Sequence, residues 1–318
     1  MAVSRQTSSA RADRPAPPGR GSRFGQVSGG RQNGYGYLFF APFLLVFLIA
    51  IAAPLAYAVH LSFFQDRIIG GTVFVGLDNY RRALTDNLFH AGLGRVSLFL
   101  VLQVPLMLGI ALFAALAIDS GRLRWAGLFR IGLFIPYAVP SVVAALMWGY
   151  LYGRRFGLVA RIGEWFGTTL PDLLGRSWML ASIGNIVTWE YVGYNMLILY
   201  AALRTVPDEL YEAAVVDGAG EIRKAWSIKI PALRQALLFA TVFSIIGSFQ
   251  LFNEPNVLQS LAPSVVTTSY TPNMYAYNMA FNGQQFNFSA ALAVVLGAVT
   301  ALIAYTTQRS AIRRERTR

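Results

Sequence analysis

Two residue patterns in the second half of the chain could bind a hydroxyl-rich ligand. The first puts a carboxylate and two phenols on one helix face at the spacing i, i+3, i+4, i+7, in Val187, Glu190, Tyr191 and Tyr194. The second puts hydroxyls and small side chains at the same spacing, in Ser244, Gly247, Ser248 and Leu251. Sugars bind through hydrogen bonds and aromatic stacking, so both faces suit a sugar.

Each pattern also has a purely structural explanation. A carboxylate inside an apolar run is a functional-site hypothesis by default, but Glu190 could instead form a buried structural pair. Ser244, Gly247 and Ser248 could be small residues that let two membrane helices pack closely. The residues alone leave both alternatives open.

The elements that must position these faces are membrane helices. Of the 318 residues, 55% are hydrophobic and only 13% are charged, against about 25% charged residues in soluble domains. The formal net charge of +12 could indicate nucleic acid or a lipid surface as the partner. Because the arginines lie in tails and short loops between apolar runs, we expect membrane lipid and no nucleic acid. The chain has no cysteine, and its two histidines are too few for a metal site.

Six runs are apolar and long enough to cross a bilayer core, which needs about 20 residues. They are residues 37–59, 96–118, 131–153, 177–203, 235–253 and 288–308, and Glu190 is the one charged residue in them. Pro136 and Pro140 should kink the third span. We therefore expect an all-α integral membrane protein with six transmembrane helices. The tail 1–36, rich in Gly, Ser, Arg and Pro, should be disordered.

Positive residues predict the orientation of these spans, because Lys and Arg favour the cytoplasmic side. With six spans, the tail 1–36, loop 119–130, loop 204–234 and the basic tail 309–318 share one side and hold 19 of the 27 Lys and Arg residues. The other side holds eight, with none in loop 254–287. Both termini and loop 204–234 are therefore expected in the cytoplasm.

Loop 204–234 has the sequence of two short helices joined by a glycine bend. Pro207 and the two acids after it suit the first turn of a helix, and Gly218 should end that helix. Glu221 begins a second helix, which Pro231 should end. A compact helix pair of this kind suits docking into a groove on another protein. It could alternatively be a linker that lies on lipid headgroups.

The same loop resembles the EAA loop of binding-protein-dependent ABC importer permeases, and we call residues 204–234 the EAA-like loop. The family pattern is E-A-A, three residues, G, nine residues, then I-x-L-P. The matching residues are Glu212, Ala213, Ala214, Gly218, Ile228 and Pro231, with Asp217 before the glycine as in the sugar branch. Ile230, Ala225 and Gln235 stand where the family often has Leu, Phe and Pro.

The resemblance covers most of the chain beyond the N-terminal tail. The segments similar to carbohydrate-uptake permeases of the maltose and glycerol-phosphate type are FVGLDNY (74–80), FIPYAVPSVVAALMW (134–148), LRTVPDELYEAA (203–214) and SFQLFNEPNVL (248–258). An ungapped comparison with the maltose-type permease places its sugar-contacting positions on the eight residues of the two helix faces. Most of those side chains differ here, so the resemblance implies the geometry of a solute pathway and not its ligand.

What the resemblance implies is the permease subunit of an ABC sugar importer in a bacterial-type inner membrane. Its partners would be a second permease, two cytoplasmic ATPases that bind ATP and Mg, and an extracytoplasmic binding protein. Glu212 would anchor in the ATPase cleft through charge-assisted hydrogen bonds, and Gly218 would supply the bend. The residues agree that the ATPase is another chain, because a Walker A loop needs Gly before Lys and neither Lys224 nor Lys229 has one.

Two other classes of protein are the alternatives. An ion-gradient-driven secondary transporter would favour repeated halves and several intramembrane charges, whereas this chain has one such charge and no clear repeat. A membrane-embedded enzyme would need a catalytic cluster, and the predicted spans contain no Cys, His or paired carboxylates. We therefore expect no enzymatic activity and no cofactor in this chain.

Overall fold

The computed structural model describes residues 33–67, 69–154 and 157–316. Residues 1–32 of the predicted disordered tail and the last two residues of the basic tail lie outside the described residues. The chain divides into two units, residues 1–53 and 54–318. In the first unit, helix α1 (Asn33–Phe47) is followed by the π-helical stretch η1 (Leu48–Ala52).

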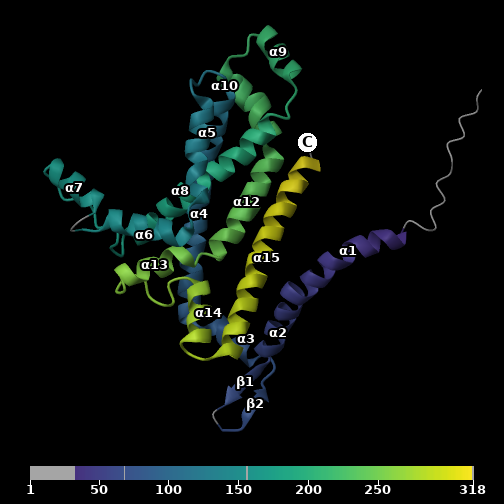
Figure 1. Cartoon of the computed structure of the whole chain (residues 1–318), viewed down its shortest axis with the longest axis vertical. Helices are drawn as coiled ribbons and strands as arrows, with labels where there is room; N and C mark the ends of the chain where they lie inside the picture. The colour runs from purple at the N-terminus through teal and green to yellow at the C-terminus, as the bar shows by residue number, and fades with distance from the viewer. Residues whose placement is uncertain (1–32, 68, 155–156, 317–318) are drawn as a thin grey trace, which may run out of the picture. The chain divides into compact units, whose positions relative to one another are not determined.

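The second unit is mostly helical (Figure 1). Its longer helices are α4 (Asn87–Asp119), α8 (Met179–Leu203), α12 (Arg234–Phe249) and α15 (Phe286–Arg316). Its shorter helices, counting α2 at the boundary, are α2 (Ala53–Ser62), α3 (Asp78–Thr85), α5 (Ala126–Phe134), η2 (Ile135–Ala138), α6 (Ser141–Tyr152), α7 (Leu158–Trp165), α9 (Asp208–Val216), α10 (Glu221–Lys224), η3 (Ala225–Lys229), α11 (Ile230–Ala232), α13 (Asn253–Leu261) and α14 (Pro272–Phe281).

The fold departs from the all-α expectation at a small β-hairpin. Strands β1 (Phe64–Arg67) and β2 (Gly71–Phe74) pair in antiparallel fashion. Gly70 and Gly71 have φ angles of +104° and +67°, which glycine adopts without a steric penalty. The Gly-Gly pair therefore supplies the turn between the two strands.

Three helices in the described ranges are long and apolar enough to cross a membrane, namely Tyr37–Ser62, Asn87–Asp119 and Phe286–Ala311. Two bent helix pairs would raise the number to five, Ala126–Ala138 with Ser141–Tyr152 and Glu221–Ala232 with Arg234–Phe249. The fourth predicted span coincides with α8, which carries the buried polar residues Ser182, Glu190 and Asn195. The six spans and the cytoplasmic location of both termini stay predictions.

Residues 131–153, predicted as the third span, form two helical segments and not one continuous helix. The helical segment that ends at Ala138 lies at 100° to α6. The bend falls between Pro136 and Pro140, and Pro140 precedes α6 with an extended ψ of 132°. Proline has no backbone N–H to continue a helix, and the kink expected here is a bend of 100° between two helices.

Helix α8 is the packing centre of the second unit. It packs against α4 along much of its length and also contacts α5, η2 and α12 (Figure 1). Gly193 allows the closest of these approaches, because a Cβ atom there would lie 1.8 Å from the Leu133 carbonyl oxygen of α5. This contact places η2, which follows α5 directly, beside the tyrosines of α8.

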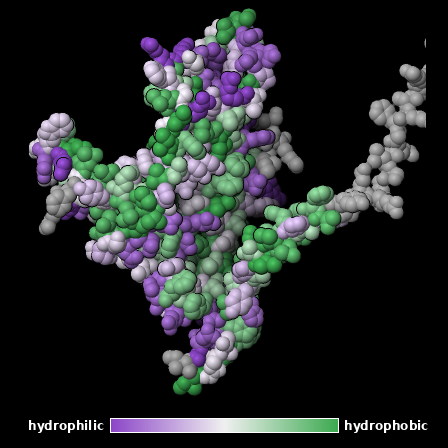
Figure 2. All heavy atoms as spheres, in the orientation of Figure 1, coloured by the Kyte–Doolittle hydropathy of each residue, from purple (hydrophilic) through white to green (hydrophobic). Residues whose placement is uncertain are grey.

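The surface of the second unit carries both hydrophilic and apolar areas. Figure 2 shows hydrophilic side chains gathered over the end that carries α9 and α10, and apolar side chains over α5 and α6. Val101, Phe113 and Leu128 are each more than 60% exposed. Large exposed apolar surfaces mark contact with a membrane or another protein, which supports a membrane location.

Candidate functional site

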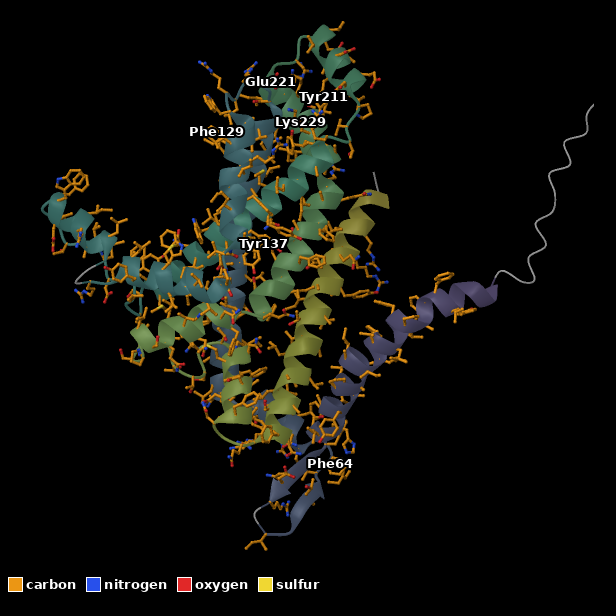
Figure 3. The ribbon with its side chains drawn as sticks, in the orientation of Figure 1. Phe64, Phe129, Tyr137, Tyr211, Glu221 and Lys229 are labelled. Atoms are coloured by element: carbon orange, nitrogen blue, oxygen red, sulfur yellow. The ribbon has the colours of Figure 1, made fainter. Side chains whose placement is uncertain are left out.

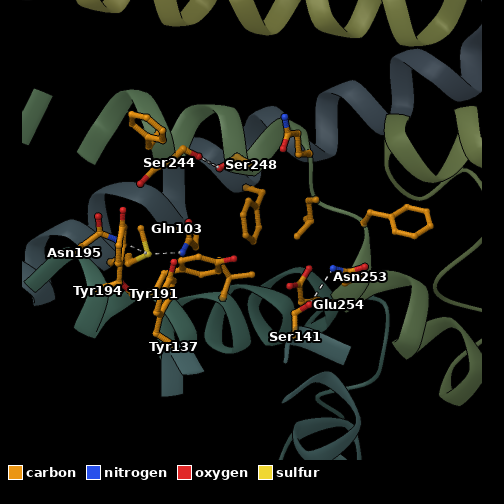
Figure 4. Close-up of a pocket in the computed structure, with 18 residues that line it drawn as sticks. Gln103, Tyr137, Ser141, Tyr191, Tyr194, Asn195, Ser244, Ser248, Asn253 and Glu254 are labelled. Carbon is orange, nitrogen blue, oxygen red and sulfur yellow. Dashed lines mark hydrogen bonds between the residues drawn. The ribbon is translucent and has the colours of Figure 1, made fainter. Parts of the chain in front are cut away.

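A cavity of about 400 Å³ lies between α4, α8, α12 and the segment that leads into α13 (Figure 4). Its lining residues are Phe99, Gln103, Met107, Tyr137, Ser141, Val187, Tyr191, Tyr194, Asn195, Phe243, Ser244, Gly247, Ser248, Gln250, Leu251, Phe252, Asn253 and Glu254. Sites for small molecules typically measure about 300–1,000 Å³ and combine apolar walls with a few polar groups. The cavity has the size and the chemistry to hold a sugar.

Seven of the eight residues predicted on the two helix faces line this one cavity. They are Val187, Tyr191, Tyr194, Ser244, Gly247, Ser248 and Leu251. The eighth, Glu190, is not in the lining and is only 3% exposed. Tertiary packing therefore brings the two faces together, while the role of these residues in solute passage stays a prediction.

Three tyrosines form an aromatic wall of the cavity. Tyr137 of η2 stacks on Tyr194 of α8, with ring centroids 4.7 Å apart and an interplanar angle of 16°. Tyr137 also meets Tyr191 edge-on, at 5.8 Å and 71°. Such a wall offers ring faces for stacking and phenol groups for hydrogen bonds, which are the two interactions that a sugar needs.

Amide side chains are held in place around the same space. Gln103 Nε2 donates a 3.3 Å hydrogen bond to Thr188 Oγ1, which ties α4 to α8. Asn253 Nδ2 donates a 2.9 Å hydrogen bond to Ser141 Oγ, which ties the start of α13 to α6. These amides are therefore fixed before a ligand arrives, which reduces the entropy lost on binding.

Glu254 is the main lining residue that the sequence did not single out. It lies in the predicted polar loop 254–287, where the structure has helices α13 and α14. Glu254 is 6% exposed and lies close enough to the Glu190 carboxyl group to interact with it electrostatically. Within the described part of the chain, no donor reaches either carboxylate oxygen of Glu190. The one feature of the sequence that could have pointed to Glu254 is its position three residues after Leu251, the last residue of the predicted second face.

Tyr137 and Gln103 were also missed. Tyr137 lies between Pro136 and Pro140, in a segment predicted as the middle of a span, and Gln103 is a single polar residue in an apolar helix. Their partners lie on α8, more than 50 residues away along the chain. In the described ranges, no group of three or more His, Asp or Glu residues could hold a metal.

The EAA-like loop contains the glycine bend where the sequence predicts it. Helix α9 ends in a pair of backbone hydrogen bonds, from Ala219 N to Ala214 O at 2.8 Å and from Gly218 N to Val215 O at 2.9 Å. Gly218 has a φ angle of +72°. This is the Schellman arrangement, in which a left-handed glycine terminates a helix.

The predicted docking residues lie on an open surface of this loop. Glu212, Ala213, Asp217 and Gly218 are exposed, and Ala214, Ile228 and Pro231 are half-buried. Large apolar side chains beside them are also exposed, namely Leu210, Val215, Val216, Ile222 and Trp226, with Val216 at 88%. An exposed apolar patch with charged neighbours is typical of a protein interaction site.

The second helical stretch of the loop ends at Ala232, one residue after the predicted end at Pro231. The chain stays helical through α10, η3 and α11, and it bends by 64° into α12 at Leu233. The stretch before Pro231 is π-helical. We attribute the continuity to this wider turn, which relieves the clash between the proline ring and the carbonyl of residue i−4.

Charged groups cluster at the base of the loop. The Lys224 Nζ atom lies 2.6 Å from a Glu221 carboxylate oxygen, and this hydrogen bond holds the pKa of Glu221 below its usual range. Figure 3 shows Glu221, Tyr211 and Lys229 gathered at the end of the unit that carries α9 and α10, while Tyr137 lies toward the middle. The loop and the cavity are thus separate sites in one unit.

Comparisons with known proteins identify the family of the chain. Residues 107–316 match the family described as binding-protein-dependent transport system inner membrane component. The arabinooligosaccharides transport system permease protein AraP of Halalkalibacterium halodurans is 31% identical over 273 residues, which cover 85% of this chain and 85% of AraP. The diacetylchitobiose uptake system permease protein NgcF of Streptomyces coelicolor is 31% identical over 320 residues, which cover 92% of this chain and 86% of NgcF.

The fold is similar to that of a bacterial ABC transporter involved in the import of the acidic polysaccharide alginate, with a TM-score of 0.77 at 18% identity. The match covers 88% of this chain and 96% of that chain. The family match confirms the resemblance carried by the EAA-like loop, and it favours a transport permease over a secondary transporter or an enzyme. The chain belongs to the binding-protein-dependent transport system inner membrane components, the permease family of ABC importers.

Proposed function

We propose that the chain is one of two permease subunits of an ATP-driven importer for a neutral or basic carbohydrate. The observation that carries this proposal is the cavity, where stacked tyrosines, hydroxyls and fixed amides face one space in a chain of the permease family. Relatives named for arabinooligosaccharides and diacetylchitobiose support the carbohydrate class. A second permease would complete the pathway, and an extracytoplasmic binding protein would deliver the solute.

The EAA-like loop would dock into a cytoplasmic ATPase subunit. Its exposed apolar side chains, including Val216 and Trp226, would be covered by the ATPase cleft. Glu212 is exposed on α9, the helix that also carries Val216. It can therefore accept charge-assisted hydrogen bonds from the partner. ATP and Mg would bind to that partner chain.

The charge of the cavity supports a neutral or basic solute. Among the lining residues that the structure describes, Glu254 carries a carboxylate, and no Lys, Arg or His is present. An acidic sugar would therefore find no basic side chain in this lining with which to pair. The structural likeness to the alginate importer, at 18% identity, shows the fold alone and does not argue for an acidic solute.

The solute class can be tested with the cognate binding protein, because that protein selects the solute first. A thermal-shift screen with matched neutral, amino and uronic sugars should give hits among the neutral or amino sugars. Hits confined to uronic sugars would contradict the charge argument.

The energy source can be tested with the complete complex in proteoliposomes. The sugar found in the screen should be taken up when ATP is supplied and no ion gradient is present. Uptake that needs an ion gradient and ignores ATP would contradict the proposed function and restore the secondary-transporter alternative.

A further inference from the structure

A buried ion pair links the EAA-like loop to the end of α4. The Lys229 Nζ atom of η3 lies 2.6 Å from the Asp119 Oδ2 atom, the last residue of α4. The two side chains are only 8% and 9% exposed. Their positions are 110 residues apart along the chain, so the pair joins two segments that no local element connects.

Stability alone is a poor explanation for this pair. A carboxylate at a helix C-terminus faces the negative end of the helix dipole, and burying two charges removes them from water. Replacing both members of such a pair by uncharged groups is often neutral for stability. The arrangement is therefore better explained by the fixed placement of one segment against the other.

Tyr211 extends the link to the first helix of the loop. The Lys229 Nζ atom lies 5.4 Å from the centroid of the Tyr211 ring, and Tyr211 precedes the motif residue Glu212 on α9. Burial, with a smaller contribution from the Asp119 carboxylate, raises the pKa of the Tyr211 hydroxyl. Lys229 thus contacts both the helix expected to enter the ATPase cleft and the end of α4.

The family pattern does not account for Lys229. It stands between Ile228 and Ile230, at the position that the E-A-A…G…I-x-L-P pattern leaves open. Helix α4 packs more extensively against α8 than any other pair of elements does, and α8 carries the cavity tyrosines. A displacement of α4 would therefore reach the cavity through close packing.

We propose that Tyr211, Lys229 and Asp119 form a coupling clamp, which passes the motion of the EAA-like loop to α4 and on to the cavity wall on α8. Lys229 is then a positioning residue for the transport cycle. The clamp rests on the proposed function, because it needs an ATPase that moves the loop.

The first test compares a buried pair with an exposed one in the reconstituted complex. Arg122, three residues after the end of α4, also pairs with Glu221 of the loop, but the charged groups are 3.8 Å apart and Arg122 is 77% exposed. The Asp119→Asn/Lys229→Met double variant should keep the ATPase subunits bound. Its coupling ratio, the amount of solute transported per ATP hydrolysed, should fall about tenfold, which is within the usual range of coupling between two sites. Arg122→Ala should leave this ratio unchanged. A double variant with the wild-type ratio, or an equal fall in Arg122→Ala, overturns the clamp.

The second test separates coupling from folding in one sample. The chain has no cysteine, so Asp119→Cys/Lys229→Cys can be joined with a short, reducible bis-methanethiosulfonate linker when the partner subunits are cysteine-free. The solute transported per ATP hydrolysed should be low before the two cysteines are linked. It should recover after linking and fall again when the linker is reduced. A ratio that the linker does not change overturns the clamp. A wild-type complex that hydrolyses ATP without solute uptake would instead overturn the proposed function.

Discussion

Most polar residues that line the cavity are uncharged. Tyr137 and Tyr194 form a stacked pair, and the amides of Gln103 and Asn253 are already hydrogen-bonded to neighbouring side chains. Binding would then depend on ring stacking and on hydrogen bonds that replace water. Such contacts discriminate between solutes by shape and hydroxyl pattern more than by long-range attraction.

Tyr194 gives a test of the stacking contribution. Tyr194→Ala should raise the KM of solute uptake by up to about tenfold, because an aromatic pair contributes about 0.5–1.5 kcal/mol beyond the area it buries. Tyr194→Phe keeps the ring and should change KM less. Uptake kinetics in proteoliposomes would show this order, and an unchanged KM in Tyr194→Ala would contradict a place for the ring in the pathway.

Tyr275 gives a test of pH dependence outside the spans. Its hydroxyl donates a 2.8 Å hydrogen bond to Asp86 Oδ2, and burial, with Asp86 adding to it, raises the pKa of Tyr275 from 10.0 to about 12. The folded state therefore favours the protonated phenol. Its stabilising contribution is fully present below pH 10.0 and is lost as the pH rises through about 12.

The measurement compares the wild-type chain with Tyr275→Phe. The difference between their unfolding midpoints should be constant up to pH 10 and shrink toward pH 12. A difference that already disappears at neutral pH would show that the hydrogen bond to Asp86 does not stabilise the fold.

At the scale of elements, two kinds of local geometry place the functional surfaces. A left-handed glycine turns α9 away from α10 at Gly218, and a missing side chain at Gly193 lets α5 touch α8. The first sets the form of the docking surface, and the second sets the position of Tyr137 in the cavity wall.

The bend in the EAA-like loop predicts opposite results for two neighbouring glycines. Gly218→Asp puts a side chain on a left-handed backbone, a conformation that glycine adopts most readily, and it adds a charge to the docking surface. It should abolish solute uptake and co-purification of the ATPase while the chain stays in the membrane. Gly220 has a φ angle of −71° and precedes α10 as its N-cap, where aspartate is favoured, so Gly220→Asp should keep both. Equal behaviour of the two variants would contradict the role of the bend.

The close approach of α5 and α8 gives a second matched pair. Gly193→Ala places a Cβ atom 1.8 Å from the Leu133 carbonyl oxygen, so α5 must move and the chain should lose about 1–3 kcal/mol of stability. Gly184→Ala on the same helix meets its nearest atom at 3.6 Å, an ordinary contact, and should be tolerated. Thermal unfolding in detergent would measure both, and a stable Gly193→Ala would show that the helices do not pack this closely.

At the scale of the whole second unit, the cavity and the EAA-like loop are separate sites on connected helices. The loop lies at one end and the hairpin β1–β2 lies toward the other (Figure 1). Helices α4, α8 and α12 run between the loop end and the cavity. This arrangement suits a transport protein in which an ATPase acts on the loop and the solute binds in the cavity.

The predicted orientation of the unit can be tested with single cysteines, because the chain has none. Thr72 on β2 and Ser310 on α15 are both exposed. A membrane-impermeant thiol reagent should label Thr72→Cys from outside the cell and Ser310→Cys only in inverted vesicles. Labelling of both from the same side would contradict the predicted topology.

The sequence by itself determined the features that depend on neighbouring residues. Long apolar runs indicate a membrane protein because each must be buried in lipid, and Gly218 predicts a helix end because its backbone freedom is local. The helical spacing of Tyr191 and Tyr194 predicts that they share a face. It does not say which element meets that face, so the sequence could not place Tyr137 against them.

Only the tertiary structure decided which distant groups come together. It put Glu254 beside Glu190, joined Lys229 to Asp119 across 110 residues, and turned the third predicted span through 100°. The first two depend on long-range packing, which periodicity cannot report, because it gives the face of a helix and not its neighbour. The bend depends on how the segment after Pro140 packs, since membrane helices often keep a proline with only a slight kink.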